Sequence, residues 1–539
     1  MDELEEYLLK APTAKGWKRV GVSSHHGINV FLSALRTKKS SGIGELLDLL
    51  PIIDWCSDLK MDVIQLLPLN NSRHDPSPYN PISSCAINFI YLSLHDLPYL
   101  DQFLPLKMRI KEMASLNDSQ RVAYAEVAVQ KLNWLGTYIQ QVGSLITETS
   151  EFKNFVKENL WLESYALFKT LKIQMGNNPA PEWPEKLQRP SKSELQDLCV
   201  EHQTQMTFYF IMQFLCFKQL KYVKEYANSK GIFLKGDIPI LVSRDSADVW
   251  EHPNFFSMDL VAGAPPDAYQ PDGQCWGFPI YDWNAIEKDQ FKWWKQRLHY
   301  ATYFYDLYRI DHTVGFFRIW TIPMNRPCRE GSFLPSDNRI WEFQGTHLLD
   351  MMISSSNGML PIAEDLGTVP TCVPSVLLQL GLCGTKVIRW EWKEPQDQTK
   401  TLHYLPYEEY PRISLTCVST HDTETLKGWW IECPKEAKAF ASFKKWEFHP
   451  KLNHSHHVEI LWDSHHTPSL FHINLLQEYL ALFPELVWPS PEEERINVPG
   501  TFNSNNWTYR YRPTVEEIVS HPGLKEIMKK ILFSPSPHI

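Results

Sequence analysis

Short apolar runs that alternate with helical patterns are the feature that most restricts the fold of this 539-residue chain. Six runs are rich in branched apolar residues and bounded by Gly, Pro or polar clusters, as buried parallel strands are. They span residues 61–69, 231–240, 307–311, 360–367, 385–392 and 412–420. Helical patterns precede most of them, for example at 44–59 and at 214–230, where Gly231 follows as a C-terminal cap. This alternation predicts an α/β fold, and the number of runs favours a closed (β/α)8 TIM barrel over an open sheet.

The chain is about twice as long as a plain barrel, so we expect large insertions. Residues 1–98 are predicted to form the N-terminal part of the barrel and 214–539 its remainder. Between them, 99–213 are predicted to form an inserted helical subdomain, because apolar residues there recur three and four positions apart. These are Leu132, Leu135, Ile139, Val142 and Ile146. A stretch at 245–284, dense in Pro, Gly and Trp, is interpreted as a long active-site loop that acts as a lid or binding loop.

Charge and composition narrow the choice of partners and compartment. The net charge of -10 offers no broad basic surface, so we expect no nucleic-acid partner. The N-terminal segment is acidic, and no apolar run of 18 residues occurs, so we expect no membrane partner and a cytoplasmic location. The ten cysteines form no CxxC pair and no zinc-type spacing, which predicts reduced thiols and no metal site. Aromatic residues reach 13%, and exposed rings suit flat sugar faces.

The segment RIDH at 309–312 closes one predicted strand. Arg309 and Asp311 are two residues apart and would share one face at the barrel mouth. A guanidinium favours the ionised form of a neighbouring carboxyl group, as a nucleophilic aspartate requires. The alternative is an ion pair at the barrel end without a chemical role.

Two further acidic segments also follow predicted strands. Glu364 and Asp365 close one strand, and because neighbours on a strand face opposite sides, only one of them can point into the site. That carboxylic acid could protonate a departing oxygen, and the spacing leaves open which of the two it is. His421 and Asp422 follow another strand, where a carboxylate could stabilise an oxocarbenium-like transition state. Paired carboxylates at strand ends indicate cleavage of a glycosidic bond, and HExxH, GxSxG and GxxxxGK[ST] are all missing from the sequence.

Several segments together resemble the amylomaltase, or disproportionating enzyme, family of 4-α-glucanotransferases, glycoside hydrolase family 77. They include KGDIPILVSRDSADVWEHPNFF, GAPPDAYQPDGQCWGFPIYDWN, YRIDHTVGFFRIW, IAEDLG, STHD and RINVPGTFNSNNWTYR, in the family's order. The resemblance implies that Asp311 is the nucleophile, Glu364 the acid/base and Asp422 the transition-state stabiliser. It also implies substrate-binding roles for Arg309, His312, His421, Asp237, Asp267, Trp276, Ser77 and Tyr79.

The resemblance further implies a retaining transfer of α-1,4-glucan segments through a covalent glucosyl-aspartate, without a cofactor. Maltooligosaccharides, glycogen-derived glucans or other α-glucans would be the partners. The sequence departs from the family where the usual PPDYF reads PPDAY, which moves the ring to Tyr269, and where the N-terminal HPTSLPG is replaced. A hydrolase or branching enzyme with the same acids, and a catalytically silent glucan-binding protein, remain alternatives.

Overall fold

Eight parallel strands form the centre of the protein, as the computed structural model shows for residues 2–72, 75–267, 270–393 and 402–536. In chain order they are β1 (His25–Val30), β2 (Val63–Leu66), β3 (Phe233–Ile238), β8 (Leu307–Ile310), β11 (Leu360–Ala363), β12 (Gly384–Val387), β15 (Ser414–Cys417) and β16 (Phe471–Leu475). Each strand except β12 pairs with its predecessor in this series, and β16 returns to β1. The last gap is closed where the Ala363 amide donates to the Cys383 carbonyl at 2.8 Å, beside a parallel bridge between Ile362 and Cys383. The predicted (β/α)8 barrel is therefore confirmed.

All six predicted strands are present, although most are shorter than the apolar runs that revealed them. The prediction of a strand over 385–392 was partly wrong. The strand β12 ends at Val387, and the chain continues as a 3-10 helix, Ile388–Trp390. Two strands were not predicted. β1 begins with two histidines, and β16 alternates His472 and Asn474 with apolar residues, so neither is a continuous apolar run.

The barrel interior has an apolar half and a polar half. Near the strand N-termini it is filled by a buried cluster that Trp17 of α2 (Ala14–Val20) helps to close. Nearer the C-terminal ends, Asn29, Gln65 and Lys235 occupy one level of three neighbouring strands. The Lys235 ammonium donates to the Gln65 side chain at 2.7 Å, while Asn29 Oδ1 is buried without a hydrogen-bond partner among the described residues. Lys235 pairs with Leu307, so the interior becomes polar two inward-facing levels before Asp311, the predicted nucleophile.

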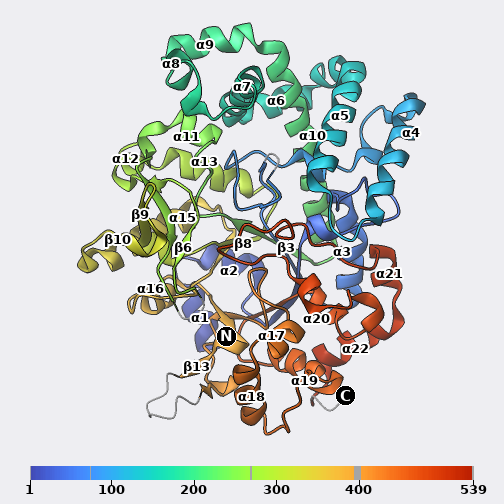
Figure 1. Ribbon diagram of the computed structural model, residues 1–539, viewed down its shortest axis with the longest axis vertical. Helices are drawn as coiled ribbons and strands as arrows, with labels where there is room; N and C mark the ends of the chain where they lie inside the picture. Colours follow the sequence, from blue (N-terminus) through green and yellow to red (C-terminus); the bar gives the residue numbers. More distant parts are fainter. Residues whose placement is uncertain (1, 73–74, 268–269, 394–401, 537–539) are drawn as a thin grey trace.

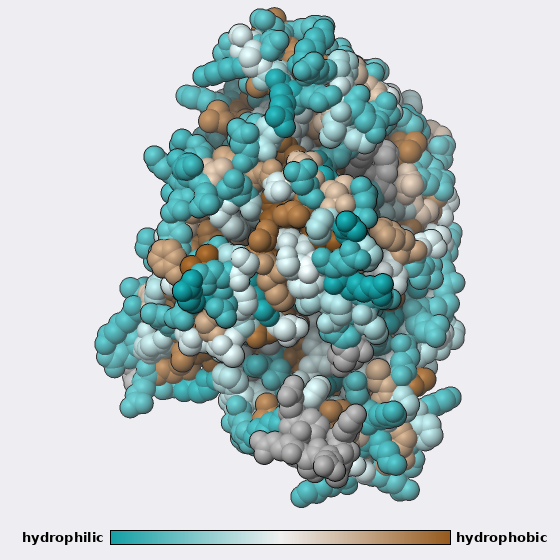
Figure 2. Space-filling model, turned by 60° about the vertical axis from the view of Figure 1, so that its left-hand side comes forward, coloured by the Kyte–Doolittle hydropathy of each residue, from teal (hydrophilic) through white to brown (hydrophobic). Residues whose placement is uncertain are grey.

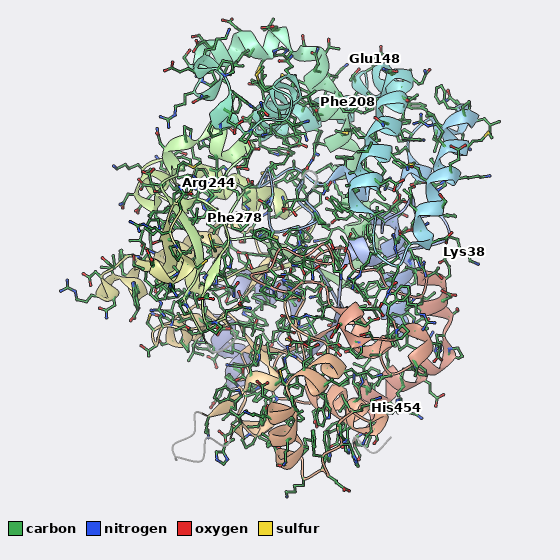
Figure 3. All side chains as sticks on the ribbon, viewed as in Figure 1. Lys38, Glu148, Phe208, Arg244, Phe278 and His454 are labelled. Atoms are coloured by element: carbon green, nitrogen blue, oxygen red, sulfur yellow. The ribbon has the colours of Figure 1, made fainter. Side chains whose placement is uncertain are left out.

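Helices fill the long connection between β2 and β3 and lie at one end of the molecule, at the top of Figure 1. Figure 3 marks Glu148 and Phe208 in this region and His454 near the opposite end. The helices are α4 (Leu104–Met113), α5 (Tyr124–Thr147), α6 (Ser150–Glu158), α7 (Trp161–Gln174), α8 (Glu185–Gln188), α9 (Lys192–Glu201) and α10 (Gln203–Ser229). On α5 the predicted apolar face is buried at Leu135, Val142 and Ile146.

One buried ion pair joins this helical region to the barrel. Lys131 of α5 donates to Glu45 at 2.6 Å and to the carbonyls of Ile90 and Leu92. α10 continues across residue 213 and packs on β3, so one helix belongs both to the insertion and to the barrel wall. The division of the chain at 99 and 213 remains a prediction.

A small antiparallel sheet stands beside the barrel mouth. Its strands run in the order β10 (Ser332–Leu334), β9 (Ile319–Pro323), β5 (Leu260–Ala264) and β6 (Gln274–Cys275). Two of these strands come from the 245–284 segment, whose role as a lid remains a prediction. Figure 2 shows hydrophobic residues gathered in a hollow on one face of the molecule, surrounded by largely hydrophilic residues. Within the described ranges, no helix is both long and apolar enough to cross a membrane.

Candidate active site

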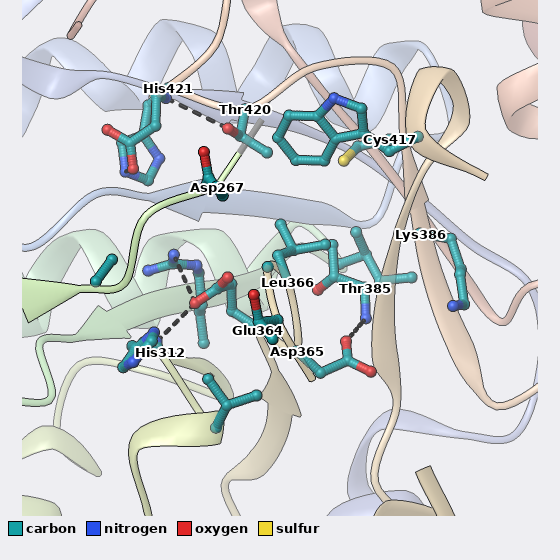
Figure 4. A pocket seen from close by; sticks show the side chains of 18 of the residues that line it. Asp267, His312, Glu364, Asp365, Leu366, Thr385, Lys386, Cys417, Thr420 and His421 are labelled. Carbon is teal, nitrogen blue, oxygen red and sulfur yellow. Dashed lines mark hydrogen bonds and ion pairs between the residues drawn. The ribbon is translucent and has the colours of Figure 1, made fainter. Parts of the chain in front are cut away.

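A cavity of about 510 Å³ opens at the C-terminal ends of the barrel strands, next to the small sheet. Seven of the predicted site residues line it: Arg309, His312, Glu364, His421, Asp422, Asp267 and Trp276. Figure 4 shows Glu364 between His312 and Asp365, with Asp267 lying toward His421. Residues that are far apart in the sequence thus meet at one rim, as the barrel rule predicted.

Arg309 is the centre of the polar network. Its Nη1 donates to both oxygens of Asp237 at 3.0 Å and to Asp311 Oδ1 at 2.9 Å. Its Nη2 lies 3.6 Å from Glu364 Oε2. A single guanidinium on β8 therefore contacts carboxylates that follow or end three neighbouring strands.

Strand register explains why these groups meet. Arg309 pairs with Asp237 on one side and with Ile362 on the other. Asp311 and Glu364 each lie two residues beyond this level, and the Glu364 amide donates to the Ile310 carbonyl at 3.1 Å. Side chains two residues apart point the same way on a strand, so both carboxyl groups project from one level of adjacent strands.

Glu364 has a strongly raised pKa. Burial raises its pKa to about 8; Arg309 opposes this effect and the nearby Asp311 adds to it. Asp365 also lines the cavity and burial raises its pKa as well, but its carboxylate accepts a hydrogen bond from the Thr385 amide at 2.7 Å. Glu364, by contrast, lies 3.6 Å from Arg309, the residue that also contacts Asp311, and this geometry favours Glu364 over Asp365 as the acid.

His312 holds Glu364 through its backbone. Its φ of 44° is in the left-handed region, which is unusual for a residue other than glycine. This conformation accompanies a hydrogen bond from the His312 amide to Glu364 Oε2 at 2.7 Å. Burial lowers the pKa of the His312 imidazole to about 4, so its ring is neutral at physiological pH.

Asp422 is held in its ionised form. Asn497 donates to Oδ1 at 2.7 Å, and His421 Nε2 lies 3.1 Å from Oδ2. Enclosure in the pocket works against the charge, but His421 and Asn497 outweigh it and lower the pKa of Asp422 to about 2. The rim therefore combines a protonated glutamate with an ionised aspartate.

Aromatic rings support both sides of the rim. Tyr79 stacks on His421 with ring centroids 5.1 Å apart, and its hydroxyl donates to Asp237 at 2.7 Å. Trp507 packs against both rings. On the opposite side, Trp276 meets His312 edge-on at 4.9 Å. Tyr79 and Asp237 therefore lie behind the cavity, where they fix Arg309 and His421.

The remaining predicted residues are less directly involved. Asp267 is exposed at the cavity rim. Ser77 precedes Tyr79 by two residues and its amide donates to Asp75; among the described residues it does not line the cavity. Tyr269 lies outside the described residues.

Three contributors were not predicted. Asn497 and Trp507 lie in the segment RINVPGTFNSNNWTYR, which carried the resemblance, but nothing in its spacing distinguishes those residues. Ile240 acts through its amide, which donates to Asp311 Oδ2 at 3.2 Å, and its carbonyl accepts from the Tyr281 hydroxyl at 2.6 Å. A backbone contact of this kind leaves no side-chain signature. Across the described residues, no cluster of three His, Cys, Asp or Glu side chains could hold a metal ion.

This fold and rim define the class of parallel-barrel enzymes that use paired carboxylates at the strand ends, the arrangement required for glycosidic-bond chemistry. The family model described as 4-alpha-glucanotransferase matches residues 30–516. The chain is 41% identical to the 4-alpha-glucanotransferase of Chlamydia pneumoniae, over 98% of this chain and 99% of that protein. It is 42% identical to that of Chlamydia caviae, over 97% and 98%.

A solved structure, the amylomaltase of Streptococcus agalactiae in complex with acarbose, has a TM-score of 0.78 and 25% identity, covering 94% of this chain and 98% of that one. The chain belongs to the 4-alpha-glucanotransferase family, a family of glucan-transferring enzymes. The resemblance stated from the sequence is thereby confirmed.

Proposed function

We propose that this protein transfers α-1,4-glucan segments from a donor chain to the 4-hydroxyl of an acceptor sugar by a retaining double displacement. The observation that carries the proposal is the contact of Arg309 with both Asp311 and Glu364, the second of which has its pKa raised to about 8. One carboxyl group is thus available as a nucleophile and the other as an acid, side by side.

In the first step, Asp311 attacks the anomeric carbon while Glu364 gives its proton to the departing glycosidic oxygen. The Ile240 amide and Arg309 each hold one oxygen of Asp311, which fixes the direction of attack. A covalent glucosyl ester on Asp311 results. In the second step, Glu364 acts as a base and takes the proton of the incoming hydroxyl as the ester is displaced.

Asp422 would stabilise the positive charge that develops on the sugar ring, because its carboxylate stays ionised. Trp276, His312, His421 and Asp267 surround the same space and would bind the sugar units on either side of the cleaved bond. Arg309, Asp237, Tyr79 and Ser77 would support them from behind or from the preceding loop. A sugar hydroxyl as second-step nucleophile gives transfer, whereas water gives hydrolysis.

Maltooligosaccharides, glycogen-derived glucans or related α-glucans are the substrates we propose. The relatives are named for glucan transfer, and the amylomaltase of Streptococcus agalactiae was solved with acarbose. A cytoplasmic location is also proposed, supported by ten cysteines that are all free thiols. Fractionation of the source cells would test this location.

Incubation with maltotriose tests the function. Disproportionation yields glucose together with oligomers longer than the donor, whereas hydrolysis yields only shorter products. The same assay on Glu364→Gln should show activity reduced by about 10²- to 10⁴-fold. Asp365→Asn is the matched control, because Asn can still accept from the Thr385 amide, and its activity should stay close to that of the unmodified protein.

Only shorter products from maltotriose would overturn transfer in favour of an amylase-like hydrolase. Unchanged activity in Glu364→Gln would overturn the assignment of the acid/base. Binding of maltooligosaccharides without any product would indicate a glucan-binding protein instead.

A further inference from the structure

Two cysteines meet beside the active-site cavity, at the edge of the small antiparallel sheet. Cys275 belongs to the edge strand β6 and is exposed, and Cys328 begins the 3-10 helix Cys328–Glu330 and is half-buried. The 3-10 helix lies in the connection between β9 and β10, about 50 residues further along the chain. Neither thiol has a role in the proposed glucan chemistry.

Strand register brings the two cysteines together. Cys275 pairs with Gly263 of β5, and Gly263 pairs in turn with Trp320 of β9. The Trp320 indole donates to the Cys328 carbonyl at 3.1 Å, which folds the β9–β10 connection over the sheet toward β6. β6 and the 3-10 helix pack against each other, and Cys328 is one of the groups that act on the Cys275 thiol. This packing makes the two thiols candidates for one disulfide.

We propose that Cys275 and Cys328 are an oxidation site, at which a small-molecule disulfide converts the two thiols into one intramolecular disulfide. The bond would join β6 to the β9–β10 connection and fix the wall of the active-site cavity that carries Trp276. It would form and break reversibly.

The chemistry is a thiol–disulfide exchange in two steps. The thiolate of one cysteine attacks a sulfur of the small disulfide and expels one small thiolate, leaving a mixed disulfide on the protein. The second cysteine, as its thiolate, attacks the protein sulfur of the mixed disulfide and expels the other small thiolate. The two cysteines are oxidised by two electrons, the small disulfide is reduced to two thiols, and the cysteine protons pass through water to the expelled thiolates.

The thiol environment sets the pH at which exchange proceeds. Partial burial of the sulfur raises the pKa of Cys275 and the neighbouring Cys328 adds to this effect, while a hydrogen bond from the Gly277 amide opposes it. Only the thiolate attacks, so the exchange should accelerate as the pH rises from 7 toward 9.

The position of the bond gives it a consequence for glucan binding. Trp276 follows Cys275 directly, lines the cavity, and packs edge-on against His312. Gln274 and Trp320, on the same sheet, line the cavity as well. A covalent link at this point would hold the wall in one position while a glucan chain enters. This second part of the inference rests on the proposed function, whereas formation of the bond does not.

A peptide map tests the bond itself. The full-length protein is incubated with oxidised glutathione at pH 8.5, alkylated, digested without reduction and analysed by mass spectrometry. We expect a linked peptide pair containing Cys275 and Cys328, absent after treatment with dithiothreitol and absent in Cys328→Ser. Cys199 of α9 and Cys433, which follows α17 (Leu426–Glu432), are half-buried thiols elsewhere and should show mixed disulfides or alkylation only. Recovery of Cys275 solely as a mixed disulfide or an alkylated thiol would overturn the proposal.

The maltotriose assay then tests whether the disulfide, by holding the cavity wall that carries Trp276, changes glucan transfer. Oxidation should lower kcat/KM several-fold in the unmodified protein, dithiothreitol should restore it, and Cys275→Ser and Cys328→Ser should not respond to the oxidant. A linked peptide pair with unchanged kcat/KM would overturn the effect on the wall. If the protein had no transferase activity before oxidation, the proposed function would fail while the peptide map still decided the disulfide.

Discussion

The apolar and polar halves of the barrel interior are built from the same strands, but the apolar half packs the core and the polar half carries the site residues. On β8, Leu307 lies in the apolar half, Arg309 lies two residues further on, and Asp311 follows the strand. On β11 the same progression runs from Leu360 through Ile362 to Glu364. Each step of two residues keeps the side chain inside the barrel and moves it toward the C-terminal rim. Packing and chemistry are therefore separated by one or two levels of the same sheet.

The comparison shows what each half requires. The apolar half is stabilised by close packing of hydrophobic side chains, including Trp17 at the N-terminal end of the barrel. These side chains need no hydrogen-bond partners. The upper half holds several charged groups away from bulk solvent, and these groups depend on one another. Arg309 links the carboxylates, and burial together with Arg309 lowers the pKa of Lys235 beneath them. Substitutions in the two halves should accordingly affect different measurements.

The largest effect is expected from Asp311→Asn. Asn keeps the size of the side chain but removes the carboxylate of the proposed nucleophile, so kcat/KM for maltotriose should fall by about 10³-fold or more. The free energy of unfolding in urea should change little, because the change is confined to the rim. A fall of several kcal/mol in the free energy of unfolding of Asp311→Asn would contradict the separation of packing from chemistry in the two halves.

Leu360→Ala should have the converse effect. The residue is fully buried in the apolar half, and a leucine-to-alanine cavity typically costs about 2–5 kcal/mol. Urea unfolding should show this loss, while kcat/KM per folded molecule stays near its original value. A large change in kcat/KM with stability unaltered would show that the lower half controls the rim.

The pH dependence follows from Glu364, which must be protonated to act as an acid. Its pKa of about 8 means that kcat/KM should decline above this pH, approaching tenfold per pH unit. The folded-state pKa lies above the ordinary value of 4.5, so the folded protein binds the extra proton between these pH values. The contribution of Glu364 to stability is therefore lost as the pH rises toward 8.

Glu364→Gln should remove this pH dependence of stability. Thermal unfolding at pH 9 should show the Gln variant to be more stable than the unmodified protein, and the difference should diminish toward pH 4.5. A difference that is independent of pH would contradict the raised pKa.

Asn497→Ala should have a smaller effect on activity. It removes one donor to the charged Asp422 carboxylate, a hydrogen bond of about 1.5–3 kcal/mol, and so should lower kcat/KM by about 10- to 100-fold. Asn497→Asp would place a second carboxylate against Asp422 and should lower it further. Equal activity in all three proteins would show that Asp422 needs no support from this side.

The smallest effect is expected from Tyr281→Phe, which removes only the hydroxyl that holds the Ile240 carbonyl. The Ile240 amide positions Asp311, and loss of a neutral hydrogen bond of about 0.5–1.5 kcal/mol should lower kcat about 2- to 10-fold with KM little changed. Tyr300→Phe is a matched control, because its buried hydroxyl has no partner among the described residues. If Tyr300→Phe lowered kcat more than Tyr281→Phe did, the effect would come from removing a buried hydroxyl in general and not from the positioning of Asp311.

How much could be predicted from the sequence depended on the kind of signal. The acids at 311, 364 and 422 were predicted as catalytic because each follows or ends an apolar run, and the barrel rule assigns chemistry to such ends. Strand position left the choice between Glu364 and Asp365 open and the family resemblance implied Glu364; the contact of Glu364 with Arg309 supports that choice. β1 and β16 were missed because histidine and asparagine interrupt their apolar residues. The Ile240 amide and the left-handed His312 could not be predicted, since backbone direction leaves no mark on residue identity.

Chemical trapping tests the central claim, that Asp311 and Glu364 divide the chemistry between nucleophile and acid/base, most directly. Glu364→Gln is incubated with α-maltosyl fluoride, whose leaving group needs no acid, then quenched, digested and analysed by mass spectrometry. We expect a maltosyl adduct on the peptide that contains Asp311, with fragment ions that assign it to that carboxyl group. An adduct on another residue, or consumption of the fluoride without any adduct, would contradict the account.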